Sequence, residues 1–226
     1  MITLIGVGHV FGLDEHVKRI IRGRRPSIVC LELDQERFEA LRERDGERDP
    51  NPVFNLLERF QERIAHGFGA TPGSEMLAGA DAAREVGAMV ALIDRDIRIT
   101  LNRLLKLLPL KEKVILFVSG ISSLFASKKR INAELARIRT DDSYIDDFTK
   151  GAPMFKQVLI DERNEHMANA MMEISKGIAG IVAIIGDGHV LGVEQLLKEK
   201  GVQTEVIRLR DIEKGVESNR FASFSF

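Results

Sequence analysis

The chain of 226 residues is long enough for one large domain or two small ones with a well-buried core. Its 44% hydrophobic and 30% charged residues are ordinary for a soluble globular protein, and a formal net charge of −1 gives no reason to expect a nucleic acid partner. The single cysteine, Cys30, excludes an internal disulfide, and we expect it to be a buried structural thiol. Since neither a secretory signal nor a segment of membrane-spanning length stands out, we expect a cytoplasmic protein.

Alternating strand and helix patterns run along most of the chain. Apolar runs typical of strands covered on both faces lie at 1–8, 27–34, 87–96, 180–188 and 204–209. Helical patterns lie at 35–44, 53–65, 75–85, 96–108, 128–137 and 153–176. This alternation predicts an α/β fold with a mixed or mostly parallel sheet and helices packed on it.

One stretch, LIGVGHVFG at 4–12, has a near-copy, IIGDGHVLG, at 184–192. The residue numbers differ by 180 at Gly6/Gly186, Gly8/Gly188, His9/His189, Val10/Val190 and Gly12/Gly192. A helical segment (13–23 and 193–201) and another apolar run follow each copy. The sequence therefore predicts a unit of strand, glycine turn with His, helix and strand, used twice. Right-handed crossovers place both turns at the carboxyl edge of the sheet, where ligands bind in open α/β folds.

The repeated histidines are the first candidates for chemistry. Glycine turns leave a side chain sterically uncovered, so we expect His9 and His189 to meet across the site. Imidazole and carboxylate together hold first-row divalent metals, and period-two alternation puts Glu32 at the same strand edge. Glycine also lets backbone amides approach a bound ligand, and the helix that follows each turn adds a partial positive charge. The amides concerned are those of Gly6, Gly8, Gly186 and Gly188.

A dinucleotide site is a rival interpretation of the first glycine turn. Two glycines follow a strand, a helix follows them, and Glu32 or Asp34 lies where a ribose-binding acid belongs. However, the position that requires a third glycine is Phe11, and His9 would crowd the pyrophosphate. These departures favour the histidine site.

Two further charged clusters stand out. LIDRDI at 92–97 ends a predicted buried strand, and LIDERNEHM at 159–167 lies within a helix with two charged faces. A surface ladder of salt bridges is the simpler explanation. At a metal site, however, the arginines would stabilise the oxyanion that forms when a metal-bound water attacks a carbonyl.

Taken in order, the stretches GVGHV, CLELDQERFEAL, PGSEM, ALIDRDIRITLNR, IDERNEHMA and AIIGDGHVLGV resemble the TraB family, named for plasmid conjugation and pheromone-shutdown proteins. The resemblance spans about 1–211 and implies an α/β core with two related halves. It further implies an active site of His9, His189 and Glu32, with the family's paired arginine motifs at Arg95 and Arg163. More distant relatives are the Tiki metalloproteases, the erythromycin esterases and the ChaN haem-binding proteins. Tiki-type members are divalent-metal-dependent peptidases, so hydrolysis is the implied class. Many TraB homologues continue into hydrophobic membrane helices, which this sequence does not show.

The leading hypothesis is a metal-dependent hydrolase, a peptidase acting on a small peptide or peptide-like substrate. His9, Glu32 and His189 would hold Mn²⁺, Co²⁺ or Zn²⁺, or position a water directly. Glu162 is the candidate general base, and the candidate anion stabilisers are Arg95 and Arg163. The alternative is a non-catalytic module that binds haem or an anionic ligand in the same pocket.

We expect a single domain over 1–212, with a helical insertion at 97–176 and a tail at 213–226. Within the insertion, the stretch at 101–125 carries more apolar residues than one helical face can hide, and Pro109 divides it into a hairpin of two helices. A partner usually covers an apolar surface of this size. We therefore predict a homodimer or larger assembly that buries Leu116 and Phe117, with membrane-surface association as the alternative.

Overall fold

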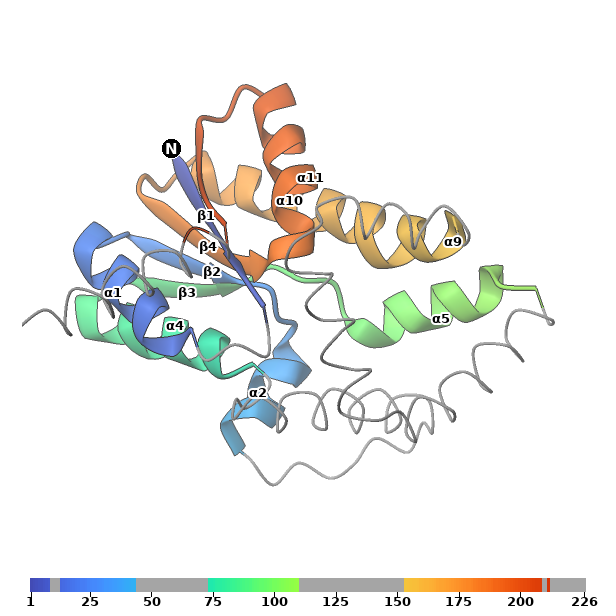
Figure 1. Ribbon diagram of the computed structural model, residues 1–226, viewed down its shortest axis with the longest axis horizontal. Coiled ribbons are helices and arrows are strands. Elements are labelled where there is room, and N and C mark those ends of the chain that lie inside the picture. The colour runs from blue at the N-terminus through green and yellow to red at the C-terminus, as the bar shows by residue number, and fades with distance from the viewer. Residues whose placement is uncertain (9–12, 44–72, 110–152, 209–210, 212–226) are drawn as a thin grey trace, which may run out of the picture.

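The computed structural model describes residues 1–8, 13–43, 73–109, 153–208 and 211. These residues form a five-stranded sheet with helices on both faces (Figure 1). The strands are β1 (Ile2–Val7), β2 (Ile28–Leu31), β3 (Met89–Leu92), β4 (Ile181–Gly186) and β5 (Thr204–Ile207). The helices are α1 (Asp14–Arg24), α2 (Gln35–Glu43), α4 (Ser74–Val86), α5 (Ile97–Leu107), α9 (Pro153–Lys156), a π-helical turn η1 (Gln157–Asp161), α10 (Glu162–Ser175) and α11 (Asp187–Glu199).

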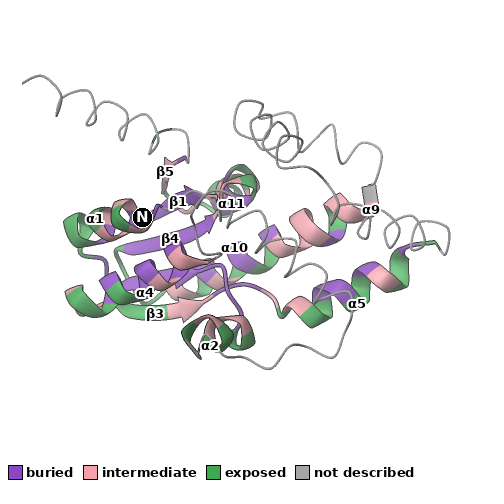
Figure 2. Cartoon of the chain, turned by 60° about the horizontal axis from the view of Figure 1, so that its bottom comes forward, coloured by how far each residue is buried: buried purple, intermediate pink, exposed green. Residues whose placement is uncertain are grey.

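All five predicted strands are present, and the prediction of an α/β fold is confirmed. The strand order is β3-β2-β4-β1-β5, and every pair of neighbours is parallel. The three central strands are almost wholly buried, as their continuous apolar runs require, whereas the edge strand β3 leaves Met89 and Val90 partly exposed (Figure 2).

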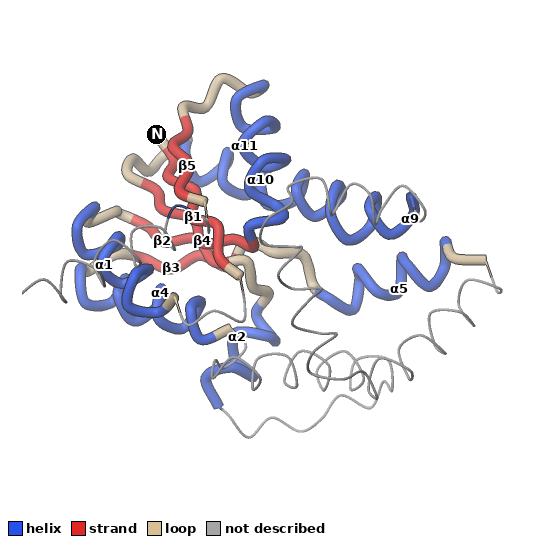
Figure 3. Tube along the Cα trace, in the orientation of Figure 1, coloured by secondary structure: helices blue, strands red, loops and turns tan. Residues whose placement is uncertain are grey.

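Two layers of helices cover the sheet (Figure 3). Helices α1 and α4 pack on one face, and α10 and α11 pack on the other. Gly79 lets α4 approach closely, because a Cβ at this position would lie 2.2 Å from Cδ1 of Ile184 in β4. Helix α10 carries Met167, Ala168 and Met171 into the core, so the end of the segment 97–176 supplies part of a core layer. The expected buried thiol is confirmed: Cys30 is buried, and this burial raises its pKa to about 12.

The two copies of the glycine repeat lie at the carboxyl ends of two adjacent strands. β1 and β4 pair with Gly6 opposite Ile185 and Val7 opposite Gly186. From β1 the chain passes through α1 to β2 on one side, and from β4 it passes through α11 to β5 on the other. Such a reversal between neighbouring parallel strands is the topological switch point at which α/β folds bind ligands.

The second copy differs from the predicted unit. The sequence predicted a glycine turn and a helix from 193, but α11 begins at Asp187, directly after the strand. His189 therefore lies in the first turn of the helix. Gly188 and Gly192 are poor helix formers and obscured this helical start. The equivalent His9 lies outside the described residues.

A helical arm extends from the carboxyl side of the sheet. It consists of α5 lying beside α9 and η1 (Figure 1), and its own small core contains Leu101, Leu104, Leu108 and Val158. α5 ends shortly before Pro109, as predicted. Leu116 and Phe117, in the second helix of the predicted hairpin, lie outside the described residues. Within the described part of the chain, no helix is long and apolar enough to cross a membrane.

Candidate functional site

Three polar side chains that follow the ends of parallel strands are buried at the carboxyl edge of the sheet. Glu32 follows β2, Asp94 follows β3 and His189 follows β4, with exposed fractions of 3%, 7% and 6%. Parallel strands bring their carboxyl ends to one edge, which is why these residues approach one another despite their separation in sequence. Buried groups of this kind require partners.

Together with Arg163 from α10, these three residues form a group that we call the inner cluster, and Arg163 lies at its centre. Its guanidinium donates to Asp94 through Nε (3.0 Å to Oδ1) and Nη2 (2.7 Å to Oδ2). Nη2 also donates to Oε1 of Glu32, and Nη1 lies 3.1 Å from Nε2 of His189. Burial by itself lowers the pKa of Arg163, but the adjacent Glu32 and Asp94 outweigh it and raise this pKa above its ordinary value. Arg163 is therefore a permanent cation.

Backbone carbonyls of the π-helical turn η1 accept hydrogen bonds from both arginines, Arg95 and Arg163. Leu159 O accepts from Nη1 of Arg163 at 3.3 Å, and Val158 O accepts from Nη2 of Arg95 at 3.3 Å. Both carbonyls belong to η1, where the widened helix alters the usual hydrogen bonding of the backbone. Single π-turns often occur at functional sites.

Glu32 connects the cluster to the second glycine repeat. Its Oε2 accepts a hydrogen bond of 2.5 Å from the backbone N of Gly186, while Oε1 lies 3.4 Å from Nε2 of His189. Thus the Gly186 amide, predicted to approach a bound ligand, binds a carboxylate of the protein itself. Nδ1 of His189 lies 2.7 Å from Oδ1 of Asn164.

Asp34, the other candidate for a ribose-binding acid, accepts hydrogen bonds from the backbone at the starts of two helices. Its Oδ1 accepts from the backbone N of Arg37 at 2.8 Å, which caps the first turn of α2. Its Oδ2 accepts from the backbone N of Ile97 at 3.3 Å and so fixes the start of α5. The Arg37 side chain reaches Oδ2 of Asp94 at 3.1 Å.

An outer cluster joins the helical arm to the same edge. Arg95 donates through Nη1 to Oε2 of Glu162 at 2.9 Å and through Nε to Oγ1 of Thr100 at 3.0 Å. Nε of Arg103 also contacts Glu162 and lies 2.6 and 2.7 Å from its two carboxylate oxygens. Partial burial tends to raise the pKa of Glu162, but the hydrogen bonds from Arg95 and Arg103 outweigh it and hold this pKa below its ordinary value. A carboxylate in this setting is a weak proton acceptor.

The helix that begins within the second glycine repeat, α11, has an acidic residue at its N-terminus. Asp187, the first residue of α11, forms a two-point ion pair with Arg208 at 2.8 and 2.7 Å. Gly6 makes room for this pair, because a Cβ there would lie 2.2 Å from Oδ1 of Asp187. Gly188 is exposed, and Gly8 is half-buried after β1. An acidic group in this position disfavours an anionic ligand at the start of α11.

The described residues include only two of the three predicted metal ligands, Glu32 and His189. The same described residues contain no group of three or more His, Cys, Asp or Glu side chains placed to hold a metal ion. Glu32 Oε1 and His189 Nε2, two of the predicted ligand atoms, instead face the guanidinium of Arg163. The third predicted ligand, His9, lies outside the described residues.

Of the predicted site residues, the structure brings together Glu32, Arg163 and His189, and places Arg95 and Glu162 in the adjoining cluster. Asp94 was visible in the sequence as an acid at the end of a strand, but its contact with Arg163 was not predicted. Asn164 and Arg37 were missed. Asn164 carries no sequence signal, because an Asn beside charged residues on a helix ordinarily faces solvent.

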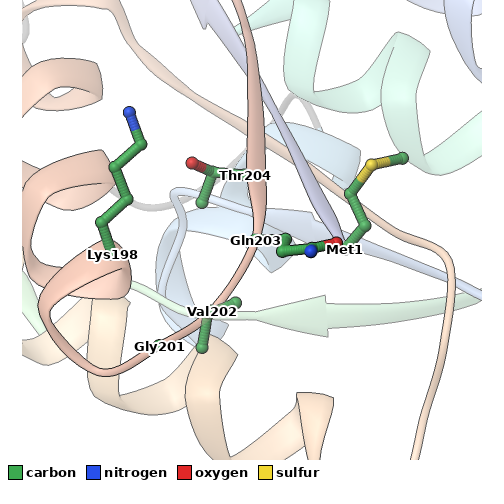
Figure 4. A pocket seen from close by; sticks show the side chains of 6 residues that line it. All are labelled: Met1, Lys198, Gly201, Val202, Gln203 and Thr204. Atoms are coloured by element: carbon green, nitrogen blue, oxygen red, sulfur yellow. The ribbon is translucent and has the colours of Figure 1, made fainter.

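The opposite edge of the sheet carries a hollow of a different kind. It has a volume of about 470 Å³ and is lined by Met1, Lys198, Gly201, Val202, Gln203 and Thr204 (Figure 4). It lies at the amino end of the strands and includes none of the residues of the two clusters.

These features define an α/β protein with a buried ionic site at the switch point of a parallel sheet. Residues 1–206 match the TraB/PrgY/gumN family, and the chain belongs to this family. It is 32% identical, over an alignment 243 positions long, to an uncharacterised protein of Methanocaldococcus jannaschii. The alignment covers 96% of this chain but 59% of the length of that relative.

Proposed function

We propose that the protein is a hydrolase that cleaves a carbonyl-centred bond in a small peptide or peptide-like substrate, with His189, Glu32 and Arg163 at the catalytic centre. One observation carries the proposal: a buried imidazole and a buried carboxylate contact a permanent cation, whose side chain is 14% exposed, at the switch point of the sheet. Proteins seldom bury several ionised groups without a functional reason, because removing them from water costs several kcal/mol per ion, roughly.

Each of the three groups suits a different part of the reaction. Nη1 of Arg163 must first move from Nε2 of His189 to the substrate carbonyl oxygen. Nε2 then accepts a proton from water as the water oxygen bonds to the carbonyl carbon, and the proton passes to the leaving amine as the carbon–nitrogen bond breaks. Arg163 donates hydrogen bonds to the oxyanion, since its charge persists at every working pH. Glu32 holds the guanidinium in place. This mechanism is the form of the hypothesis in which side chains position the water directly.

The metal-dependent form assigns Mn²⁺, Co²⁺ or Zn²⁺ to His9, Glu32 and His189. It requires Arg163 to release Oε1 of Glu32 and Nε2 of His189, the two atoms that it contacts. Glu162, proposed from the sequence as general base, has two arginine partners and a lowered pKa, so His189 suits that role better.

A fluorogenic peptide library tests the proposal, with the full chain assayed after chelation and again with each metal. Cleavage after chelation supports the direct form, and cleavage only with added metal supports the metal-dependent form. Absence of cleavage under every condition would overturn the hydrolase proposal. The alternative, a binding module for haem or an anionic ligand, is then tested by a haem titration that follows the Soret band.

A further inference from the structure

We propose that Asn164 is a positioning residue that holds His189 as the neutral tautomer with its proton on Nδ1, so that the Nε2 lone pair faces the inner cluster. The nearest partners of the two ring nitrogens indicate this tautomer. Its catalytic consequence rests on the function proposed above.

The two nitrogens of the imidazole have partners that require the same tautomer. Nε2 lies 3.1 Å from Nη1 of Arg163 and 3.4 Å from Oε1 of Glu32. The guanidinium is the nearer partner and has no acceptor, so Nε2 accepts this hydrogen bond. Oε1 of Glu32 in turn accepts from Nη2 of Arg163. The proton then belongs on Nδ1, which lies 2.7 Å from the Oδ1 acceptor of Asn164. The opposite tautomer would set two donors against each other at Nε2 and leave Nδ1 facing an acceptor.

Asn164 is itself rigidly placed. It is 5% exposed and follows Arg163 directly in α10, so consecutive residues supply the partners of both ring nitrogens. Met167 and Ala168, three and four positions further on the same face, are fully buried in the core of the sheet. A helix anchored in this way fixes the amide against the imidazole.

The last glycine of the second repeat has a role in this contact. Gly192 lies one turn after His189 on α11, and a Cβ at this position would lie 2.3 Å from Nδ2 of Asn164. Even alanine would therefore push the amide away from α11. The glycine lets Asn164 reach His189, which accounts for a repeat position that the proposed catalytic groups leave unexplained.

The tautomer matters because the reacting atom of His189 is Nε2. A proton on Nε2 would remove the lone pair that accepts a proton from water. Groups that orient a functional histidine typically change activity by about 10–100-fold when they are removed.

Two-bond ¹H–¹⁵N correlation spectra of the full chain report the proton position directly, with the His189 signals assigned by their loss in His189→Gln. We expect a proton on Nδ1 of neutral His189 in the wild type. A proton on Nε2, alone or in addition to Nδ1, would overturn the proposal. The wild-type spectrum decides this point even if a variant fails to fold.

Three variants test the role of Asn164. Asn164→Ala and Gly192→Ala should both give mixed tautomers and a kcat reduced about 10–100-fold, whereas Asn164→Asp, which keeps the acceptor, should retain the Nδ1 proton and most of the activity. If Asn164→Ala keeps both the tautomer and kcat, Asn164 is not the positioning residue. If the wild type shows the expected tautomer but cleaves no substrate, the proposed function fails and the tautomer assignment stands.

Discussion

The two ends of the same parallel sheet carry ion pairs of different kinds. At the amino end, Arg24 pairs with Glu205, and their side chains are 34% and 38% exposed. At the carboxyl end, Arg163, whose side chain is 14% exposed, pairs with Glu32 and Asp94, whose side chains are 4% and 1% exposed. An exposed ion pair loses little hydration when it forms and contributes little to stability. A buried pair loses much of its hydration, and hydrogen bonds to nearly all of its polar atoms are needed to offset this loss. The difference supports the proposal that the carboxyl end serves a function other than stability.

The largest effect should follow removal of the buried cation. Arg163→Met leaves Glu32 and Asp94 buried without their main partner, and we expect the free energy of unfolding to fall by about 3–5 kcal/mol. Urea unfolding followed by circular dichroism measures the change. A loss no greater than that caused by Arg24→Met would show that burial does not distinguish the two ends.

A smaller, pH-dependent effect is expected in the outer cluster. Glu162→Gln should lower the free energy of unfolding by about 1 kcal/mol at neutral pH, because it removes the charge that Arg95 and Arg103 contact. The pKa of Glu162 in the folded protein lies below the ordinary value of 4.5, so its ion pairs stabilise the fold above that pH. This stabilisation is lost as the pH falls through the lower pKa of the folded state.

Urea unfolding of wild type and Glu162→Gln at a series of pH values measures this effect. The difference between the two proteins should shrink on acidification below about pH 4. A difference that stays constant from neutral to acidic pH would mean that Glu162 acts through packing and not through charge.

The smallest effect is expected at the amino end of the sheet. Arg24→Met should change the free energy of unfolding by at most about 1 kcal/mol, because water screens a pair that is one-third exposed. Peptide cleavage should be unchanged in this variant, since Arg24 lies at the far edge from the site. Lost cleavage in a folded Arg24→Met protein would place functional groups at both ends of the sheet.

Much of the fold and part of the site could be predicted from the sequence. Continuous apolar runs identified all five strands. The glycine repeats placed His189 at the carboxyl edge, and the period-two alternation of its own strand placed Glu32 at the same edge. The start of α11 at Asp187 was missed because glycines weaken the helical pattern there. The contact of Asn164 with His189 depends on how α10 packs beside α11, and the contact of Arg163 with Asp94 joins α10 to the residues that follow β3. No local sequence pattern records either arrangement.

The central claim, that His189 lies at a catalytic centre, is tested most directly by kcat/KM on a peptide cleaved by the wild type. His189→Gln is compared with His166→Gln, the same substitution at an exposed position of α10. We predict a loss of about 10²–10⁴-fold for His189→Gln, in a protein that remains folded by circular dichroism, and wild-type activity for His166→Gln. Equal activity of the two variants would contradict the claim.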